Sequence, residues 1–189
     1  MGRLWVAIQA AASIVLLLYL VTRPLFSEWR DGAVERVGQG KVRSWTAPQG
    51  AAAHVSRIRI NWKASSAGAS MYCLQPEEDP RISFLLIHDI TEHGGALGDL
   101  ANRLFDHCGQ AGFVCSVFAI DLPGHGHTGM SAESGEFNMT SMVELVWEAA
   151  DWIRTETKES AVFTIGLGIG GEVAFQASSG SEAITGTIS

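Results

Sequence analysis

The sequence predicts an α/β fold: a mostly parallel sheet with flanking helices, preceded by one N-terminal transmembrane helix. Short apolar runs such as Ile82–Ile87 alternate with helical patterns from residue 82 onward. This alternation is typical of parallel sheets with right-handed crossovers. The segment Leu4–Thr22 carries no charged residue. At about 1.5 Å per residue, a helix of this length spans roughly 28 Å, close to the thickness of a bilayer core.

The apolar segment is flanked by Arg3 and Arg23. A cleaved signal peptide is the alternative interpretation, but Thr22-Arg23-Pro24 does not resemble a small-residue cleavage site. We therefore expect residues 1–22 to anchor the chain as a single-pass membrane protein. The flanking charges do not determine its orientation. Residues 23–55 are expected to form a juxtamembrane linker, with a short helix at Ser27–Val37.

Residues 56–189 are expected to form the folded core. Arg57–Trp62 alternates polar and apolar residues, as a half-buried strand does, and Ser65–Gly68 is predicted to turn the chain into a second strand at Ala69–Leu74. The remaining predicted strands are Ile82–Ile87, Phe113–Ile120, Ala161–Ile165 and Ala183–Ile188. The predicted helices are Leu97–Gln110, a helix capped by Thr140 that ends near Glu156, and one from Glu172 to about Ser178. The core is expected to be incomplete, ending near its sixth strand.

Composition restricts the function classes. The net charge of −7 argues against a nucleic-acid partner, because phosphate binding requires clustered lysine and arginine. The cysteines are odd in number and form no CxxC motif, so we expect neither a disulfide framework nor a zinc site. Histidines could suggest a metal site, but no pair has the i, i+4 spacing of helical ligands. We expect no metal and no cofactor. The residues concerned are Cys73, Cys108 and Cys115, and His88, His93, His125 and His127.

A glycine-rich turn lies between the predicted strand Ala161–Ile165 and the last helix. Its sequence is Gly-Leu-Gly-Ile-Gly-Gly over 166–171. Strand, tight turn and helix are the context of the nucleophile elbow, G-x-S-x-G, but Gly168 stands where the serine would be. The same glycines match the dinucleotide fingerprint G-x-G-x-x-G. That motif usually opens the first βαβ unit and has an acid about 20 residues on, which this sequence does not show.

Three segments together resemble the α/β-hydrolase superfamily, in particular its monoacylglycerol-lipase and serine-aminopeptidase-like branch. The segment 85–95, Leu-Leu-Ile-His-Asp-Ile-Thr-Glu-His-Gly-Gly, resembles the family's exit from its third strand. The segment 117–129 contains Asp-Leu-Pro-Gly-His-Gly-His and is similar to the family's D-x-x-G-H-G-x-S. The third segment is the glycine turn at 166–171. The resemblance covers about residues 57 to 189.

The resemblance implies a site built largely from backbone. It assigns the N–H groups of Ile90 and Ile169 to an oxyanion hole, which stabilises charge on a carbonyl oxygen. Asp89 and Thr91 stand where the family usually has glycines, and the acid and the histidine of the triad cannot be assigned within residues 1–189. No catalytic side chain is therefore assignable. The residues that match the family's structural positions are His88, Asp121, Gly124, His125, Gly126, Gly166 and Gly170.

The resemblance implies a membrane-anchored lipase or esterase acting on acyl esters. The glycine at the nucleophile position implies that its catalysis is impaired. The alternatives are a non-catalytic relative that binds a lipid or a protein partner, a truncated product, and a dinucleotide-binding domain. The expected partners are the lipid bilayer and an acyl-ester or lipid ligand, whereas protein partners are not determined.

Overall fold

The first two strands form an antiparallel hairpin, β1 (Ala53–Trp62) with β2 (Ser65–Pro76), as predicted. This computed structural model describes Trp45 and residues 52–63, 65–129, 138–158 and 160–189. The turn predicted at Ser65–Gly68 is wrong, because Trp62 already pairs with Ser65. Gly68 instead lies inside β2 with φ 68°, where a Cβ atom would be 2.5 Å from the carbonyl oxygen of Ile60. This glycine therefore marks a close backbone approach within the hairpin.

The described strands form one six-stranded sheet in the order β1-β2-β4-β3-β5-β6. The four later strands are parallel to one another, whereas β2 pairs with β4 antiparallel. The sheet is therefore mostly parallel, as the alternating pattern predicts. These later strands are β3 (Ile82–Ile87), β4 (Cys115–Ile120), β5 (Ala161–Gly166) and β6 (Ile184–Ile188).

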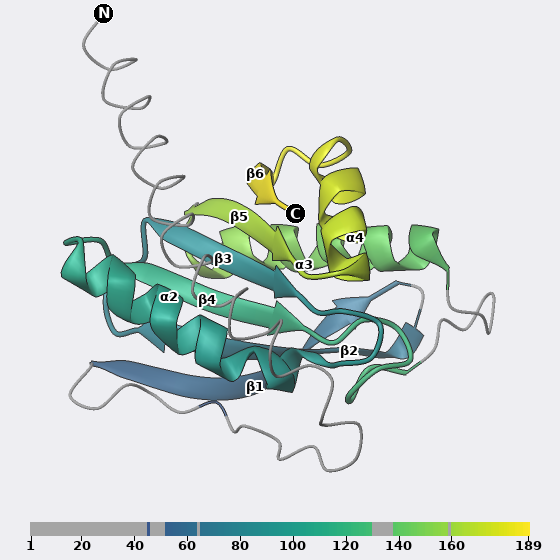
Figure 1. The fold of residues 1–189 in the computed structure, drawn as a ribbon, viewed down its shortest axis with the longest axis horizontal. Helices are drawn as coiled ribbons and strands as arrows, with labels where there is room; N and C mark the ends of the chain where they lie inside the picture. Colours follow the sequence, from purple (N-terminus) through teal and green to yellow (C-terminus); the bar gives the residue numbers. More distant parts are fainter. Residues whose placement is uncertain (1–44, 46–51, 64, 130–137, 159) are drawn as a thin grey trace, which may run out of the picture. The chain divides into compact units, whose positions relative to one another are not determined.

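Helices cover both faces of the sheet (Figure 1). Helix α2 (Gly98–Gln110), preceded by the short 3-10 helix η1 (Gly94–Leu97), lies on one face, and α3 (Met139–Glu156) and α4 (Ile169–Ser178) lie on the other. Burial on both faces explains why β3 and β4 are nearly uninterrupted apolar runs. The main core lies between the sheet and the helices α3 and α4.

Element boundaries differ from the predicted ones where a polar cap or a glycine decides them. Helix α3 is capped by Asn138, not Thr140, since the Asn138 side chain accepts a hydrogen bond of 2.8 Å from the backbone N–H of Ser141. Helix α4 begins at Ile169 rather than Glu172, because the glycines of the turn are already helical. Strand β4 begins at Cys115, and Phe113 before it is exposed.

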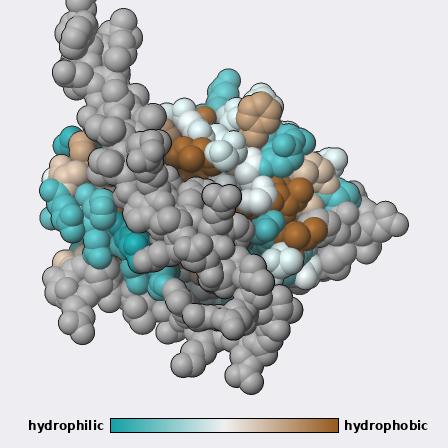
Figure 2. Space-filling model, viewed as in Figure 1, coloured by the Kyte–Doolittle hydropathy of each residue, from teal (hydrophilic) through white to brown (hydrophobic). Residues whose placement is uncertain are grey.

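Large apolar side chains are rarely exposed in the described part of the chain. Ile90, Phe113 and Phe175 are the exposed ones there. On the face seen in Figure 2, the apolar patches of the coloured residues are separated by residues of intermediate or hydrophilic character. None of the described helices is long and apolar enough to cross a bilayer. The predicted anchor at residues 1–22 and the helix predicted at Ser27–Val37 lie outside the described residues.

Candidate active site

The carboxyl ends of β3, β4 and β5 meet at one edge of the sheet, where three loops converge. Because these strands are parallel and adjacent, the segments that follow them lie close together. These segments begin at His88, Asp121 and Leu167, and they are the three that carry the resemblance. The crevice outside the carboxyl ends of parallel strands is where α/β folds place their ligand sites.

The glycine turn between β5 and α4 has the geometry of a sharp elbow. Gly168 has φ 56° and ψ −123°, a conformation that side chains rarely adopt. The glycines on either side allow close contact between backbones. A Cβ on Gly166 would lie 2.1 Å from the carbonyl oxygen of Gly170, and a Cβ on Gly170 would lie 2.4 Å from that of Ile87. The strand-to-helix turn therefore closes tightly against the end of β3.

The carboxylate of Asp89 fills the space that a side chain at Gly168 would occupy. A Cβ atom built on Gly168 would lie 2.2 Å from Oδ1 of Asp89 and 2.6 Å from its Oδ2. Such distances are far shorter than real carbon–oxygen contacts. Residue 168 therefore has no side chain, and the space that a nucleophile side chain would take there is filled by Asp89, from the loop after β3.

The same carboxylate accepts hydrogen bonds from both backbone groups that the resemblance assigns to the oxyanion hole. Oδ1 of Asp89 lies 2.8 Å from the N of Ile90 and 3.0 Å from the N of Ile169. Oxyanion-hole donors lie at about 2.7–3.1 Å from the oxygen that they stabilise. The structure thus brings the two N–H groups to one point, and the acceptor at that point is a side-chain oxygen of the protein, Oδ1 of Asp89, and not an atom of a ligand.

Two histidines fix the loop after β3. His88 is fully buried, and burial lowers its pKa, which favours the neutral ring. Its Nδ1–H donates to the carbonyl oxygen of Asp89 at 2.7 Å, and its Nε2 accepts from the N–H of Leu122 at 2.9 Å. Nε2 of His125 hydrogen-bonds to the carbonyl oxygen of Ile90 at 2.7 Å. Both rings therefore hold backbone rather than face a reacting group.

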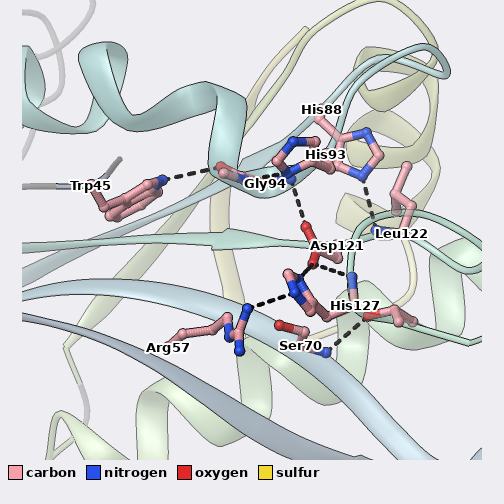
Figure 3. A network of polar contacts seen from close by, with 11 residues as sticks. Trp45, Arg57, Ser70, His88, His93, Gly94, Asp121, Leu122 and His127 are labelled. Atoms are coloured by element: carbon pink, nitrogen blue, oxygen red, sulfur yellow. Dashed lines mark hydrogen bonds and ion pairs between the residues drawn. The ribbon is translucent and has the colours of Figure 1, made fainter. Parts of the chain in front are cut away.

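A buried carboxylate joins the loops after β3 and β4 (Figure 3). Asp121 accepts hydrogen bonds from the N–H of Gly94 at 2.7 Å and from that of His127 at 2.9 Å. Arg57 on β1 extends this network through its contact of 2.7 Å with Nε2 of His127. Trp45 donates through Nε1 to the carbonyl oxygen of Gly94 at 3.2 Å. Asp121 thus acts as an anchor for the backbone of these two loops.

The predicted glycines of the second motif lie in the loop that wraps around Asp121. Gly124 and Gly126 both have positive φ, of 74° and 52°. A Cβ on Gly126 would lie 2.3 Å from Oδ2 of Asp121. A side chain at this position would therefore displace the carboxylate and disrupt its two backbone hydrogen bonds.

The other candidate residues do not gather into a site. Cys73, Cys108 and Cys115 are buried thiols, and burial raises the pKa of Cys73 to about 12, so it is a poor nucleophile at neutral pH. His93 caps the short helix η1, where its ring accepts from the N–H of Gly95. In the described ranges, no three histidine, cysteine or acidic side chains come together in a way that could hold a metal ion.

Asp89 is the site residue whose part the sequence did not reveal. Its position in a place usually taken by glycine was visible, and so was the glycine at 168. The contact between these two positions could not be seen in the sequence, because residues 89 and 168 are brought together only by the pairing of β3 with β5. The signal that could have revealed it is that the two departures from the family pattern are complementary. Position 89 carries a side chain where the family usually has glycine, and position 168 is glycine where the family has serine.

The similarity of this chain to known proteins is found in the structure and not in the sequence. A scan against protein-family models and a search of curated proteins find no match. The solved structure of a cold-adapted esterase from an Arctic intertidal metagenomic library is 18% identical and has a TM-score of 0.59, over 76% of this chain and 64% of that one. A lipase in its open form is 16% identical with a TM-score of 0.58, over 71% and 43%.

The α/β hydrolase GrgF from Penicillium sp. sh18 gives a TM-score of 0.54 at 16% identity, over 71% of this chain and 44% of that one. This chain has the α/β-hydrolase fold. It spans 43% to 64% of the length of these three solved structures. These similarities do not single out one kind of enzyme with this fold, since they extend to esterases, a lipase and a thioesterase domain alike.

The fold also bears on the dinucleotide interpretation of the glycine turn. In this α/β-hydrolase fold, the turn opens the last of the described βαβ units, β5-α4-β6, whereas the dinucleotide motif usually opens the first one. The N-terminus of α4, where a pyrophosphate would have to bind, already faces the carboxylate of Asp89 through Ile169. A second negative group at this point would be repelled. The geometry therefore favours the elbow interpretation.

Proposed function

We propose that this chain is a membrane-anchored, non-catalytic relative of the ester hydrolases, which uses the fold to bind an acyl lipid. The observation that carries the proposal is the elbow itself. Gly168 offers no nucleophile, and the carboxylate of Asp89 occupies both its side-chain space and the hydrogen-bond donors beside it. A serine-based acyl transfer needs a hydroxyl at this position and an unoccupied pair of N–H donors.

Asp89 does not substitute for the missing serine. A carboxylate can act as a nucleophile in principle. An ester carbonyl attacked by Asp89 would need the N–H groups of Ile90 and Ile169 for its developing negative charge. Oδ1 of Asp89 itself holds those groups, at 2.8 and 3.0 Å. The attacking group would therefore compete with its own substrate for the stabilising contacts.

An acyl lipid is the ligand class that agrees best with the rest of the chain. The apolar segment Leu4–Thr22 would hold the fold at a bilayer, where acyl chains are abundant. Ile90, whose backbone N–H shares Oδ1 of Asp89 with that of Ile169, leaves 48% of its surface exposed. An exposed apolar side chain on a residue whose backbone belongs to the site favours an apolar ligand over a charged one.

The absence of esterase activity is the first test. The full-length chain should remain unlabelled by a fluorophosphonate probe, which reacts with activated serines, and should hydrolyse p-nitrophenyl butyrate no faster than buffer does. Gly168→Ser alone should not restore labelling, because a serine without a general base is not activated at neutral pH and this one would also meet Asp89. Stoichiometric labelling of the unmutated chain would contradict the proposal, and peptide mapping would then identify the reactive serine.

Membrane anchoring is the second test. The full-length chain should sediment with membranes and resist extraction by alkaline carbonate, because an uncharged helix that spans the bilayer is held by its apolar surface. A chain that begins at Arg23 should lose this resistance. Recovery of the full-length protein in the carbonate-soluble fraction would contradict the anchor. Cleavage close to residue 22 would show that the segment is a signal peptide.

A further inference from the structure

We infer that Asp89 is an internal ligand of the elbow. Its carboxylate occupies the point where the N–H groups of Ile90 and Ile169 converge, the carbonyl-binding position, and keeps it closed to carboxylates and ester carbonyls. This inference deepens the proposed function and rests on it in one respect, namely that the fold binds an acyl lipid, whose ester carbonyl Asp89 would keep away from the N–H groups of Ile90 and Ile169. The position is closed because Asp89 occupies it, and not only because the serine is missing.

The contacts that support this come from two separate loops. Ile90 follows β3 and Ile169 opens α4, and the two residues are 79 positions apart in the sequence. Their N–H groups nevertheless converge on a single oxygen, Oδ1 of Asp89. Hydrogen bonds from N–H groups to a carboxylate are stronger than those between neutral groups. The group bound there is a carboxylate, which shows the chemistry that the position accepts.

The space around this oxygen also supports the inference that Asp89 closes the position. The position next to this oxygen lacks a side chain, because residue 168 is glycine. The Asp89 carboxylate lies in that space, as the distance of 2.2 Å from its Oδ1 to a Cβ placed on Gly168 shows. An incoming carboxylate or ester carbonyl would have to enter the same volume and replace the same two hydrogen bonds.

The donors should remain in place when the carboxylate is removed, because the loop backbone is held by other contacts. The carbonyl oxygen of Asp89 accepts from Nδ1–H of His88 at 2.7 Å and from the N–H of Glu92 at 3.0 Å. The carbonyl oxygen of Ile90 is bound by Nε2 of His125 at 2.7 Å. None of these contacts uses the Asp89 side chain. A smaller residue at 89 should therefore leave two N–H groups aimed at an unoccupied point.

The test uses the full-length chain in detergent micelles with ¹⁵N-labelled isoleucine, titrated with butyrate. In Asp89→Ala we expect saturable shifts of the Ile90 and Ile169 amide signals. In the unmutated chain we expect none. Asp89→Asn is the matched control, because its amide oxygen can still accept both hydrogen bonds while its negative charge is gone. We expect Asp89→Asn to remain closed, as the unmutated chain does.

Three outcomes would overturn the inference. Butyrate binding by the unmutated chain at these amides would show that the position is open. Binding by Asp89→Asn would show that charge repulsion, and not occupation, excludes the ligand. A folded Asp89→Ala that gives no shift would show that the position does not accept carboxylates. Butyrate binding is measured without turnover, so these results stand apart from the probe-labelling test of the proposed function.

A measurement on the unmutated chain covers the case in which Asp89→Ala does not fold. The amide hydrogens of Ile90 and Ile169 should exchange with solvent more slowly than those of an unstructured chain, because both are hydrogen-bonded to Asp89. Ile90 is informative here since its side chain is exposed, so burial alone does not protect its amide. Exchange of both hydrogens at unprotected rates would contradict the contact on which the inference depends.

Discussion

Replacing Gly170 with alanine is expected to lower the free energy of unfolding by about 3 kcal/mol or more. The added Cβ would lie 2.4 Å from the carbonyl oxygen of Ile87 and 2.6 Å from that of His88. Neither oxygen can easily move away. The carbonyl of Ile87 accepts from the N–H of Leu167 at 3.0 Å, and His88 is fully buried. The measurement is urea unfolding followed by tryptophan fluorescence.

Gly109→Ala is the matched control for this substitution. Gly109 lies in α2, and a Cβ placed on it would meet nothing within 4 Å. Alanine is favoured over glycine in a helix by up to about 1 kcal/mol, so this variant should be as stable as the unmutated chain or slightly more stable. If Gly170→Ala unfolded at the same urea concentration as Gly109→Ala, the close contact between the elbow and the end of β3 would be wrong.

Much of the fold could be predicted because each signal was local. The apolar run Ile82–Ile87 was predicted as a strand with the bounds that the structure has. The alternation in Arg57–Trp62 indicated a half-buried strand, and it forms one with a partner in the predicted hairpin. Such patterns arise from burial of one or both faces of a strand, and they need no knowledge of distant residues.

The boundaries that were missed depend on contacts outside the local pattern. Gly68 resembles a turn residue in isolation, but its conformation accommodates the carbonyl oxygen of Ile60 across the hairpin. Half of the first turn of α4 is glycine, a poor helix former. It is helical because tertiary packing against Ile87 holds it there. In both cases a tertiary contact outweighs the residue's own preference.

The backbone groups of the candidate site could be predicted from the sequence, but the side chain that occupies the site could not. The resemblance singled out Ile90 and Ile169 as N–H donors, and the structure brings these groups to one point. That a side chain of the protein would fill this point could not be inferred from spacing along the chain. It depends on the register of β3 with β5, which places Ile87 beside Gly166 and so brings the residues that follow each strand together.

The central claim is that Asp89 takes the place of the side chain that the elbow lacks, and a double-mutant cycle tests it most directly. The cycle compares the unfolding free energies of the unmutated chain, Gly168→Ser, Asp89→Ala and the double variant. Serine at a φ of 56° is strained whatever residue stands at position 89. That strain cancels in the cycle and leaves the interaction between the two positions.

If Asp89 fills this place, Gly168→Ser destabilises the chain much more when Asp89 is present, because the added Cβ would lie 2.2 Å from Oδ1 of Asp89. The coupling free energy should then reach about 1 kcal/mol or more, since residues in contact couple by roughly 0.5–3 kcal/mol. If the two substitutions instead add to within about 0.5 kcal/mol, as distant sites do, Asp89 does not fill the nucleophile position and the account is contradicted.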